Sequence, residues 1–197
     1  MDALSEPLTP FVVVISGVPG AGKTTLAWQL SRRLHVPFVS RDDIKTGLHV
    51  THRSNDPNEA RRFAEQAFDT FFETISVMVQ NGVSLVAEAA FHANRAHTPI
   101  AELSDSCQLI HVALITPDEI AIERYLERAQ ARPRHPSHND KRFGEEMRNG
   151  TKSVDVYRLA LPCPTLSVDG SDQWDPSIDE IVTFIQSTHT GLASPDR

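Results

Sequence analysis

The segment "GVPGAGKT" at residues 17–24 constrains the fold most, because it satisfies the pattern G-x-x-x-x-G-K-[ST]. The run before it, "FVVVIS" (11–16), is typical of a strand buried on both faces of a parallel sheet. The stretch after it, "KTTLAWQLSRRL" (23–34), has leucines at helical spacing. A strand before and a helix after are the context of a phosphate-binding loop. The chain is therefore predicted to bind a nucleoside triphosphate, with ATP favoured.

Each residue type in this loop has a chemical reason to be there. Gly17, Gly20 and Gly22 let the backbone wrap around phosphate oxygens and direct its N–H groups inward. Lys23 supplies a positive charge to the β- and γ-phosphates, and Thr24 offers a hydroxyl to Mg²⁺. The predicted cofactors are thus ATP and Mg²⁺, and the predicted cofactor-binding residues are Gly17, Val18, Pro19, Gly20, Ala21, Gly22, Lys23, Thr24 and Thr25.

The rest of the chain alternates between strand and helix patterns. Further strands are predicted over 36–40, 83–88, 107–115 and 164–170, and further helices over 58–80, 116–131 and 175–187. Thr116 is expected to cap the second of these helices. A loop is predicted over 51–57, and 132–143 is expected to be a mobile, proline-interrupted segment. Strands separated by helices imply right-handed crossovers and a parallel, helix-covered sheet, which is an α/β fold.

Composition limits the function classes. The 197 residues fit one domain, predicted over 11–187, between an N-terminal extension (1–10) and a flexible tail (188–197). The net charge of -7 argues against a global electrostatic grip on nucleic acid. The two cysteines show no metal or disulfide spacing, and no run approaches the ~20 apolar residues of a membrane span. We expect a cytoplasmic monomer or homodimer without a membrane partner.

Acidic side chains follow two of the predicted strands. Asp42 and Asp43 lie after the second strand in "PFVSRDDIKTGL" (37–48), and Glu88 ends the third. Ligands of doubly wound sheets gather at the carboxyl ends of strands, so these acids are expected to face the phosphate-binding loop. A carboxylate there can accept the proton of an attacking hydroxyl, and another can contact Mg²⁺ or orient the acceptor. Helix capping is the alternative for both aspartates.

Four segments carry a resemblance to a known group of proteins: "SGVPGAGKTTLA", "VSRDDIKTGL", "VAEAAFHANR" and "ERAQARPRHPSH". From residue 11 to about 140, the chain resembles small P-loop kinases of the adenylate-kinase-like superfamily. It looks closest to the set that includes polynucleotide kinases, zeta toxins and chloramphenicol-phosphotransferase-like enzymes. The resemblance implies a three-layer P-loop NTPase fold with a five-stranded parallel sheet of order 2-3-1-4-5. It also implies a small arginine-bearing lid at about 130–142.

The same resemblance implies roles for residues after the second strand. Asp42 is implied as the general base for a hydroxyl acceptor, while Asp43 has helix capping as its alternative. Lys45 is implied to bind the acceptor, and it stands where the polynucleotide kinases carry arginine. Lysine lacks the bidentate fork that suits a nucleotide phosphate, so this difference weakens the polynucleotide interpretation more than the small-molecule one.

Arginines repeat in the predicted lid region. Arg124, Arg128 and Arg132 are four residues apart, and Arg134 follows a proline. Arginines that reach in from a mobile segment can stabilise the charge of a transferring phosphoryl group. The resemblance favours Arg128 and Arg132 as the lid pair, with Arg128 also contacting ATP, whereas Arg124 has surface charge as its alternative.

Weaker signals come from histidines and one more arginine. Arg95 in "FHANR" is predicted to hold the acceptor, with a helix-start cation as the alternative. His135 and His138 lack the cysteine or carboxylate partners of a metal site, so contact with the acceptor or a place on the lid is favoured.

The predicted function is ATP- and Mg²⁺-dependent transfer of the γ-phosphate to a hydroxyl of a small organic molecule, such as a sugar, a nucleoside-like metabolite or an antibiotic. The predicted catalytic residues are Lys23, Asp42, Arg128 and Arg132; the acceptor-binding residues are Asp42, Lys45, Glu88 and Arg95; and the metal-binding residues are Thr24 and Glu88. Two alternatives stay open. One is a polynucleotide 5′-hydroxyl kinase, which the acidic charge disfavours, and the other is a non-catalytic ATP-binding regulatory protein.

Overall fold

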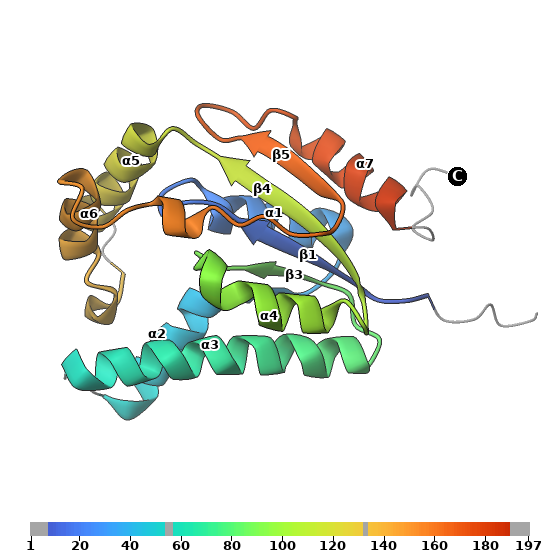
Figure 1. The fold of residues 1–197 in the computed structure, drawn as a ribbon, viewed down its shortest axis with the longest axis horizontal. Helices are drawn as coiled ribbons and strands as arrows, with labels where there is room; N and C mark the ends of the chain where they lie inside the picture. Colours follow the sequence, from blue (N-terminus) through green and yellow to red (C-terminus); the bar gives the residue numbers. More distant parts are fainter. Residues whose placement is uncertain (1–7, 54–56, 132–133, 190–197) are drawn as a thin grey trace, which may run out of the picture.

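The protein folds around a single parallel sheet, shown in Figure 1 by a computed structural model that describes residues 8–53, 57–131 and 134–189. The strands are β1 (Phe11–Ser16), β2 (Phe38–Ser40), β3 (Leu85–Glu88), β4 (Gln108–Ile115) and β5 (Thr165–Asp169). Their order in the sheet is β2-β3-β1-β4-β5, and every pairing is parallel. The predicted order 2-3-1-4-5 is therefore confirmed, and β1 lies at the centre.

Helices cover both faces of this sheet (Figure 1). They are α1 (Lys23–Leu34), α2 (Arg41–His52), α3 (Pro57–Gln80), α4 (Ala93–Leu103), α5 (Asp118–Ala131), α6 (Asp140–Arg148) and α7 (Ile178–Thr188). Helices α1 and α7 contribute to the core on one face, and α3 and α4 to the core on the other. No helix in the described ranges has the length and apolar character needed to cross a membrane.

The central strand explains the first apolar run of the sequence. Val12 and Val14 pack with α3 and α4, whereas Phe11, Val13 and Ile15 pack with α1 and α7. Every residue of β1 is buried, so neither face of the strand is exposed to water, and Phe11–Ile15 form a continuous apolar run.

Several element ends differ from the sequence prediction. The predicted loop over 51–57 is partly helical, because α2 extends to His52 and α3 begins at Pro57; residues 54–56 lie outside the described part of the chain. Thr116 does not cap α5, since its buried hydroxyl finds no hydrogen-bond partner among the described residues. Helix α7 begins three residues later than predicted, where Ser177 and Glu180 form a capping box.

Helices α4 and α6 are not among the predicted helices, and α6 shows that part of the segment expected to be mobile is folded. A 3₁₀ turn covers Pro136–His138, and α6 follows it. A Cβ on Gly144 would lie 2.3 Å from Leu126 Cδ2 of α5. A larger residue at this position would require the Leu126 side chain to move.

A buried histidine in β4 makes the stability of the fold depend on pH. His111 is 1% exposed; its Nε2 lies 2.7 Å from Ser16 Oγ and its Nδ1 lies 3.3 Å from Thr165 Oγ1. Burial lowers the pKa of His111 to about 4. The unfolded chain therefore binds a proton at His111 below about pH 6.5, whereas the folded chain does not. The free energy of unfolding is therefore highest, as far as His111 is concerned, above about pH 6.5, and it decreases as the pH falls from 6.5 toward 4.

We expect this one group to lower the free energy of unfolding by about 2 kcal/mol between pH 7 and pH 5. In urea denaturation, the difference in the free energy of unfolding between pH 7 and pH 5 should be smaller in His111→Asn than in wild type by about 2 kcal/mol. The matched control is His97→Asn, which replaces an exposed histidine on α4 and should leave the pH dependence unchanged. An equal pH dependence in all three proteins would contradict the assignment.

Candidate active site

The phosphate-binding loop connects β1 to α1 and holds a buried cation. Gly20 has a φ of 89°, and a Cβ at this position would lie 1.9 Å from the carbonyl oxygen of Ala121, so only glycine fits. Lys23 is 6% exposed, and its Nζ donates to the carbonyl oxygen of Val18 at 3.0 Å. Burial lowers the pKa of Lys23, while the carboxylate of Glu88 opposes this shift. The ammonium group of Lys23 is thus bound by the backbone of its own loop, which follows the central strand β1.

The two residues predicted to bind magnesium are hydrogen-bonded to each other. Thr24 Oγ1 donates to Glu88 Oε2 at 3.3 Å, and Ser40 Oγ donates to the same oxygen at 3.4 Å. Burial raises the pKa of Glu88, and the positive charge of Lys23 opposes this shift. A hydroxyl and a carboxylate are the oxygen ligands that Mg²⁺ prefers, so this pair fits the ion.

The two aspartates after β2 have different environments. Ser40 is the N-cap of α2 and accepts a hydrogen bond from the backbone N–H of Asp43 at 3.4 Å, so Asp43 itself is not the cap. Asp43 is exposed, whereas Asp42 forms ion pairs with Arg41, at 3.1 Å, and with Arg134. Burial alone would raise the pKa of Asp42, but the two guanidinium groups outweigh it and hold this pKa below its usual range. Asp42 is thus an ionised carboxylate at neutral pH.

Arg134 connects Asp42 to the lid region. Its Nε donates to Asp140 Oδ2 at 2.8 Å, and its Nη2 donates to Asp140 Oδ1 at 2.5 Å. The hydroxyl of Tyr125 donates to the same Asp140 carboxylate at 2.7 Å. Together these bonds join α2, α5 and α6 through one guanidinium group. Of the four predicted lid arginines, Arg134 thus makes a direct contact with the proposed base.

The other arginines of this region are placed differently. Arg128 lies over the ring of Tyr125, 5.0 Å from its centroid, and its buried Nε has no hydrogen-bond partner in the described ranges. Arg124 donates to the carbonyl oxygens of Gly170 and Ser171, so it ties α5 to the loop after β5. Arg132 lies outside the described residues.

A cavity of about 260 Å³ brings the predicted site residues together. It is lined by Pro19, Gly20, Lys23 and Thr24 of the loop and by Asp42, Lys45, Glu88, Arg95 and Arg128. Lys45 is 9% exposed, and its burial lowers its pKa. Arg95 lies over the ring of Phe68, 4.8 Å from its centroid. The nucleotide-binding loop and all four predicted acceptor residues therefore share one cavity.

Sequence reasoning missed several residues of this cavity, among them Tyr125, Lys152 and Tyr157. Neither tyrosine lies in a recognisable motif, and Lys152 follows a helix that was not predicted. His138 Nε2 lies 2.9 Å from Thr46 Oγ1, and burial lowers the pKa of His138 to about 4. Over the described ranges, no group of three or more His, Cys, Asp or Glu side chains is placed to hold a metal ion.

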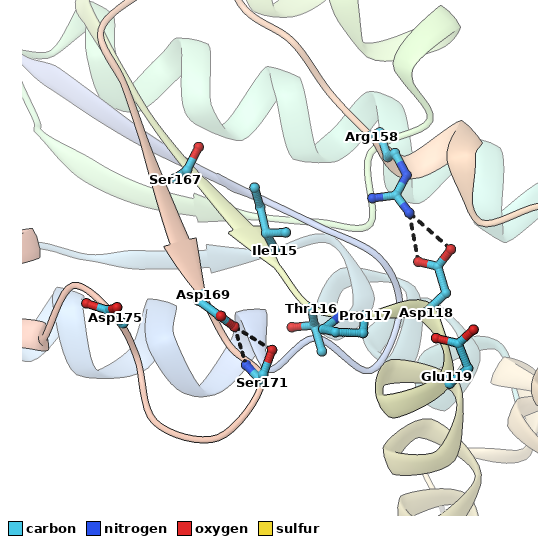
Figure 2. A pocket seen from close by; sticks show the side chains of 10 residues that line it. All are labelled: Ile115, Thr116, Pro117, Asp118, Glu119, Arg158, Ser167, Asp169, Ser171 and Asp175. Atoms are coloured by element: carbon cyan, nitrogen blue, oxygen red, sulfur yellow. Dashed lines mark hydrogen bonds and ion pairs between the residues drawn. The ribbon is translucent and has the colours of Figure 1, made fainter.

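A second cavity, of about 500 Å³, lies at the ends of β4 and β5. Figure 2 shows Ile115 at the end of β4 with Thr116 after it, and Asp169 at the end of β5 with Ser171 after it. Arg158 donates two hydrogen bonds to the carboxylate of Asp118, at 2.8 and 3.0 Å. The first cavity is lined by the phosphate-binding loop after β1, with Asp42 and Glu88 from the ends of β2 and β3 and Arg128 from α5, whereas the second cavity is lined by none of these residues.

Comparisons with known proteins agree with this arrangement. The profile of the AAA_33 family, described as an AAA domain, matches residues 12–152. A protein assigned as a kinase from Chloroflexus aurantiacus J-10-fl is 25% identical, with a TM-score of 0.76 and coverage of 91% of this chain and 98% of that chain. A sugar kinase from Janibacter sp. HTCC2649 is 18% identical, with a TM-score of 0.60 and coverage of 94% and 99%. No curated protein matches the chain significantly.

A gluconokinase from Sinorhizobium meliloti 1021 also has this fold; it is 15% identical, with a TM-score of 0.55 and coverage of 94% of this chain and 97% of that chain. The TM-scores indicate a shared fold, and the family profile covers most of the chain. The chain therefore belongs to the AAA_33 family of AAA domains, and its predicted assignment as a P-loop kinase is confirmed.

Proposed function

We propose that the protein transfers the γ-phosphoryl group of ATP to a hydroxyl of a small organic molecule. One observation carries this proposal: Lys23 of the phosphate-binding loop and the carboxylate of Asp42 line the same cavity. Phosphoryl transfer needs a held triphosphate, an oriented hydroxyl and cations that stabilise the spreading negative charge. The names of similar structures, a sugar kinase, a gluconokinase and a shikimate kinase, support a small acceptor of this kind.

In this proposal different residues bind the phosphates, accept the proton and stabilise the transferring group. The loop amides and Lys23 hold the phosphates, while Asp42 accepts a hydrogen bond from the acceptor hydroxyl and takes its proton as the new O–P bond forms. Asp42 is ionised at neutral pH and can therefore accept that proton, while its ion pairs with Arg41 and Arg134 make it a weaker base than a free aspartate. Arg128 supplies a cation to the transferring group.

The ion and the nucleotide base also find suitable surroundings. Thr24 and Glu88 would hold Mg²⁺, which neutralises charge on the β- and γ-phosphates when bound. We place the acceptor beside Asp42 and Glu88, which follow β2 and end β3. We therefore assign the adenine base of ATP to the second cavity, at the ends of β4 and β5 (Figure 2). The buried hydroxyl of Thr116 lacks a hydrogen-bond partner in the described part of the chain, and it lines that cavity.

An acceptor screen tests the proposed function. The protein is incubated with ATP, Mg²⁺ and a panel of sugars, sugar acids, nucleosides, antibiotics and a 5′-hydroxyl oligonucleotide, and ADP formation is followed. Phosphorus NMR then identifies the phosphate monoester. We expect acceptor-dependent ADP formation with small molecules. Labelling of the oligonucleotide alone would favour the polynucleotide interpretation, and binding of ATP without any transfer would favour a regulatory protein.

A further inference from the structure

The acceptor side of the 260 Å³ cavity carries an excess of positive charge. Arg41, Arg95 and Lys152 line this cavity together with His92, and we call the three cations Arg41, Arg95 and Lys152 the cationic wall. They come from three separate segments: the start of α2, the start of α4 and the loop after α6. The pKa of His92 reflects their proximity: burial lowers it first, and the charges of Lys152, Arg41 and Arg95 lower it further.

The cations of this wall are poorly neutralised by the protein. Arg95 lies over the ring of Phe68, and Lys152 lies over the ring of Phe143, 4.2 Å from its centroid. In the part of the chain that the structure describes, neither Arg95 nor Lys152 forms an ion pair. The acid that acts on Lys152 is Glu146, which already pairs with Arg142 at 2.7 Å.

Arg41 adds an unsatisfied donor to the same wall. One of its Nη atoms contacts Asp42 at 3.1 Å, but its buried Nε has no hydrogen-bond partner among the described residues. A buried N–H group without a partner costs free energy, so a site for a ligand is a physical reason for its presence. An anionic oxygen would satisfy this donor.

The triphosphate of ATP has its own cations elsewhere in the cavity. Lys23 lies in the phosphate-binding loop, and Arg128 lies on α5, beyond β4. In the wall, Arg41 follows β2 and Arg95 follows β3, beside Asp42 and Glu88. Lys152 reaches the same cavity from the loop after α6. Its position therefore matches the acceptor, and the cavity volume lies below the ~300–1,000 Å³ typical of sites for drug-sized ligands.

We propose that the acceptor is a small anionic alcohol, whose carboxylate or phosphate group binds the cationic wall while its hydroxyl faces Asp42. This inference rests on the proposed kinase function and specifies its substrate class. An anionic group held by Arg41, Arg95 and Lys152 would also orient the hydroxyl, because it anchors the acceptor at a second point.

The test uses matched pairs of probes: aldonic acids and sugar phosphates, each paired with the uncharged sugar of the same carbon skeleton. Binding is measured by calorimetry on the protein saturated with a non-hydrolysable ATP analogue, and turnover is measured with ATP. We expect the charged member of at least one pair to bind about 10-fold or more tightly than its uncharged partner, since charged hydrogen bonds each contribute this much. The acid and phosphate arms distinguish the two sources of the anion.

Two variants locate the anion site. Arg95→Met and Lys152→Met should each raise the KM for the charged acceptor about 10-fold, with the KM for ATP nearly unchanged. Neither should alter the KM for the uncharged partner. The control is Arg62→Met, which removes an arginine stacked on Phe63 at 5.0 Å but outside the cavity lining, and it should match wild type.

The outcomes separate this inference from the proposed function. Equal binding within every pair, binding of neither member of any pair, or wild-type kinetics in both wall variants would overturn the anionic acceptor. Turnover of uncharged alcohols without a charge preference would overturn it too, while the kinase function would stand. Wall-dependent binding of anions without ADP formation from any acceptor would support the anion site and refute the kinase function.

Discussion

Replacing Asp42 with asparagine should lower kcat for the acceptor by about 10² to 10⁴-fold, while the affinity for ATP stays nearly unchanged. The amide has almost the same shape as the carboxylate, and its oxygen can still accept a hydrogen bond from Arg134, so the ion-paired network is weakened rather than removed. What the amide cannot do is take the proton of the acceptor hydroxyl. Steady-state kinetics with an acceptor from the screen and calorimetry with an ATP analogue measure the two effects separately.

The neighbouring acid provides the matched control. Asp43→Asn makes the same change at an exposed residue. Ser40 accepts a hydrogen bond from the backbone N–H of Asp43, so the substitution leaves this contact in place. It should retain wild-type kcat. If Asp42→Asn lost ATP affinity and transfer to the same degree, its role would be structural. If both variants lost transfer equally, the distinction between the two aspartates would be wrong.

The parts of the fold that follow from local patterns were predictable. The buried run before the phosphate-binding loop identifies β1 because a strand covered on both faces has no polar side. The acids at 42 and 88 were placed together because parallel strands end at one edge of the sheet. The strand order came from the resemblance to P-loop kinases, whose motifs are local as well.

Features that depend on tertiary packing were not predictable in the same way. Helix α6 was not predicted, and its Gly144 lies close to the side chain of Leu126 on α5, a contact between helices that the local sequence does not indicate. Without α6, the pairing of Asp140 with Arg134 and the place of Lys152 in the cavity could not be foreseen. These residues have no fixed spacing from any motif, because the fold alone brings them to the site.

The arginines of the lid show how far spacing can mislead. Arg124 and Arg128 are one helical turn apart, yet Arg124 binds the carbonyl oxygens of Gly170 and Ser171 while Arg128 lines the cavity. Arg134 was the weaker candidate by motif, and it makes the contact with Asp42. Helical periodicity places residues on one face, but the neighbouring elements decide what each long side chain reaches.

Replacing Lys23 with methionine should lower the affinity for ATP by about 10²-fold or more, because an ammonium group donates charge-assisted hydrogen bonds to phosphate oxygens and methionine donates none. The fold should survive the change. Burial lowers the pKa of Lys23, so the protein loses a costly buried charge, and the methionine side chain can fill much of the same space. Calorimetry with an ATP analogue and the melting temperature at pH 6 measure binding and folding separately.

The choice of pH matters because Glu88 loses its positive neighbour in this variant. Burial already raises the pKa of Glu88, and removal of Lys23 raises it further, so Glu88 can take up a proton and remain buried as a neutral group. A group whose pKa is raised on folding stabilises the protein less as the pH rises above the usual pKa of a carboxyl group. The melting temperature of Lys23→Met relative to wild type should therefore fall as the pH rises. Lys141→Met, on the exposed surface of α6, is the control for both measurements. Undiminished ATP affinity in Lys23→Met would refute the assigned role of the loop lysine, whatever its stability.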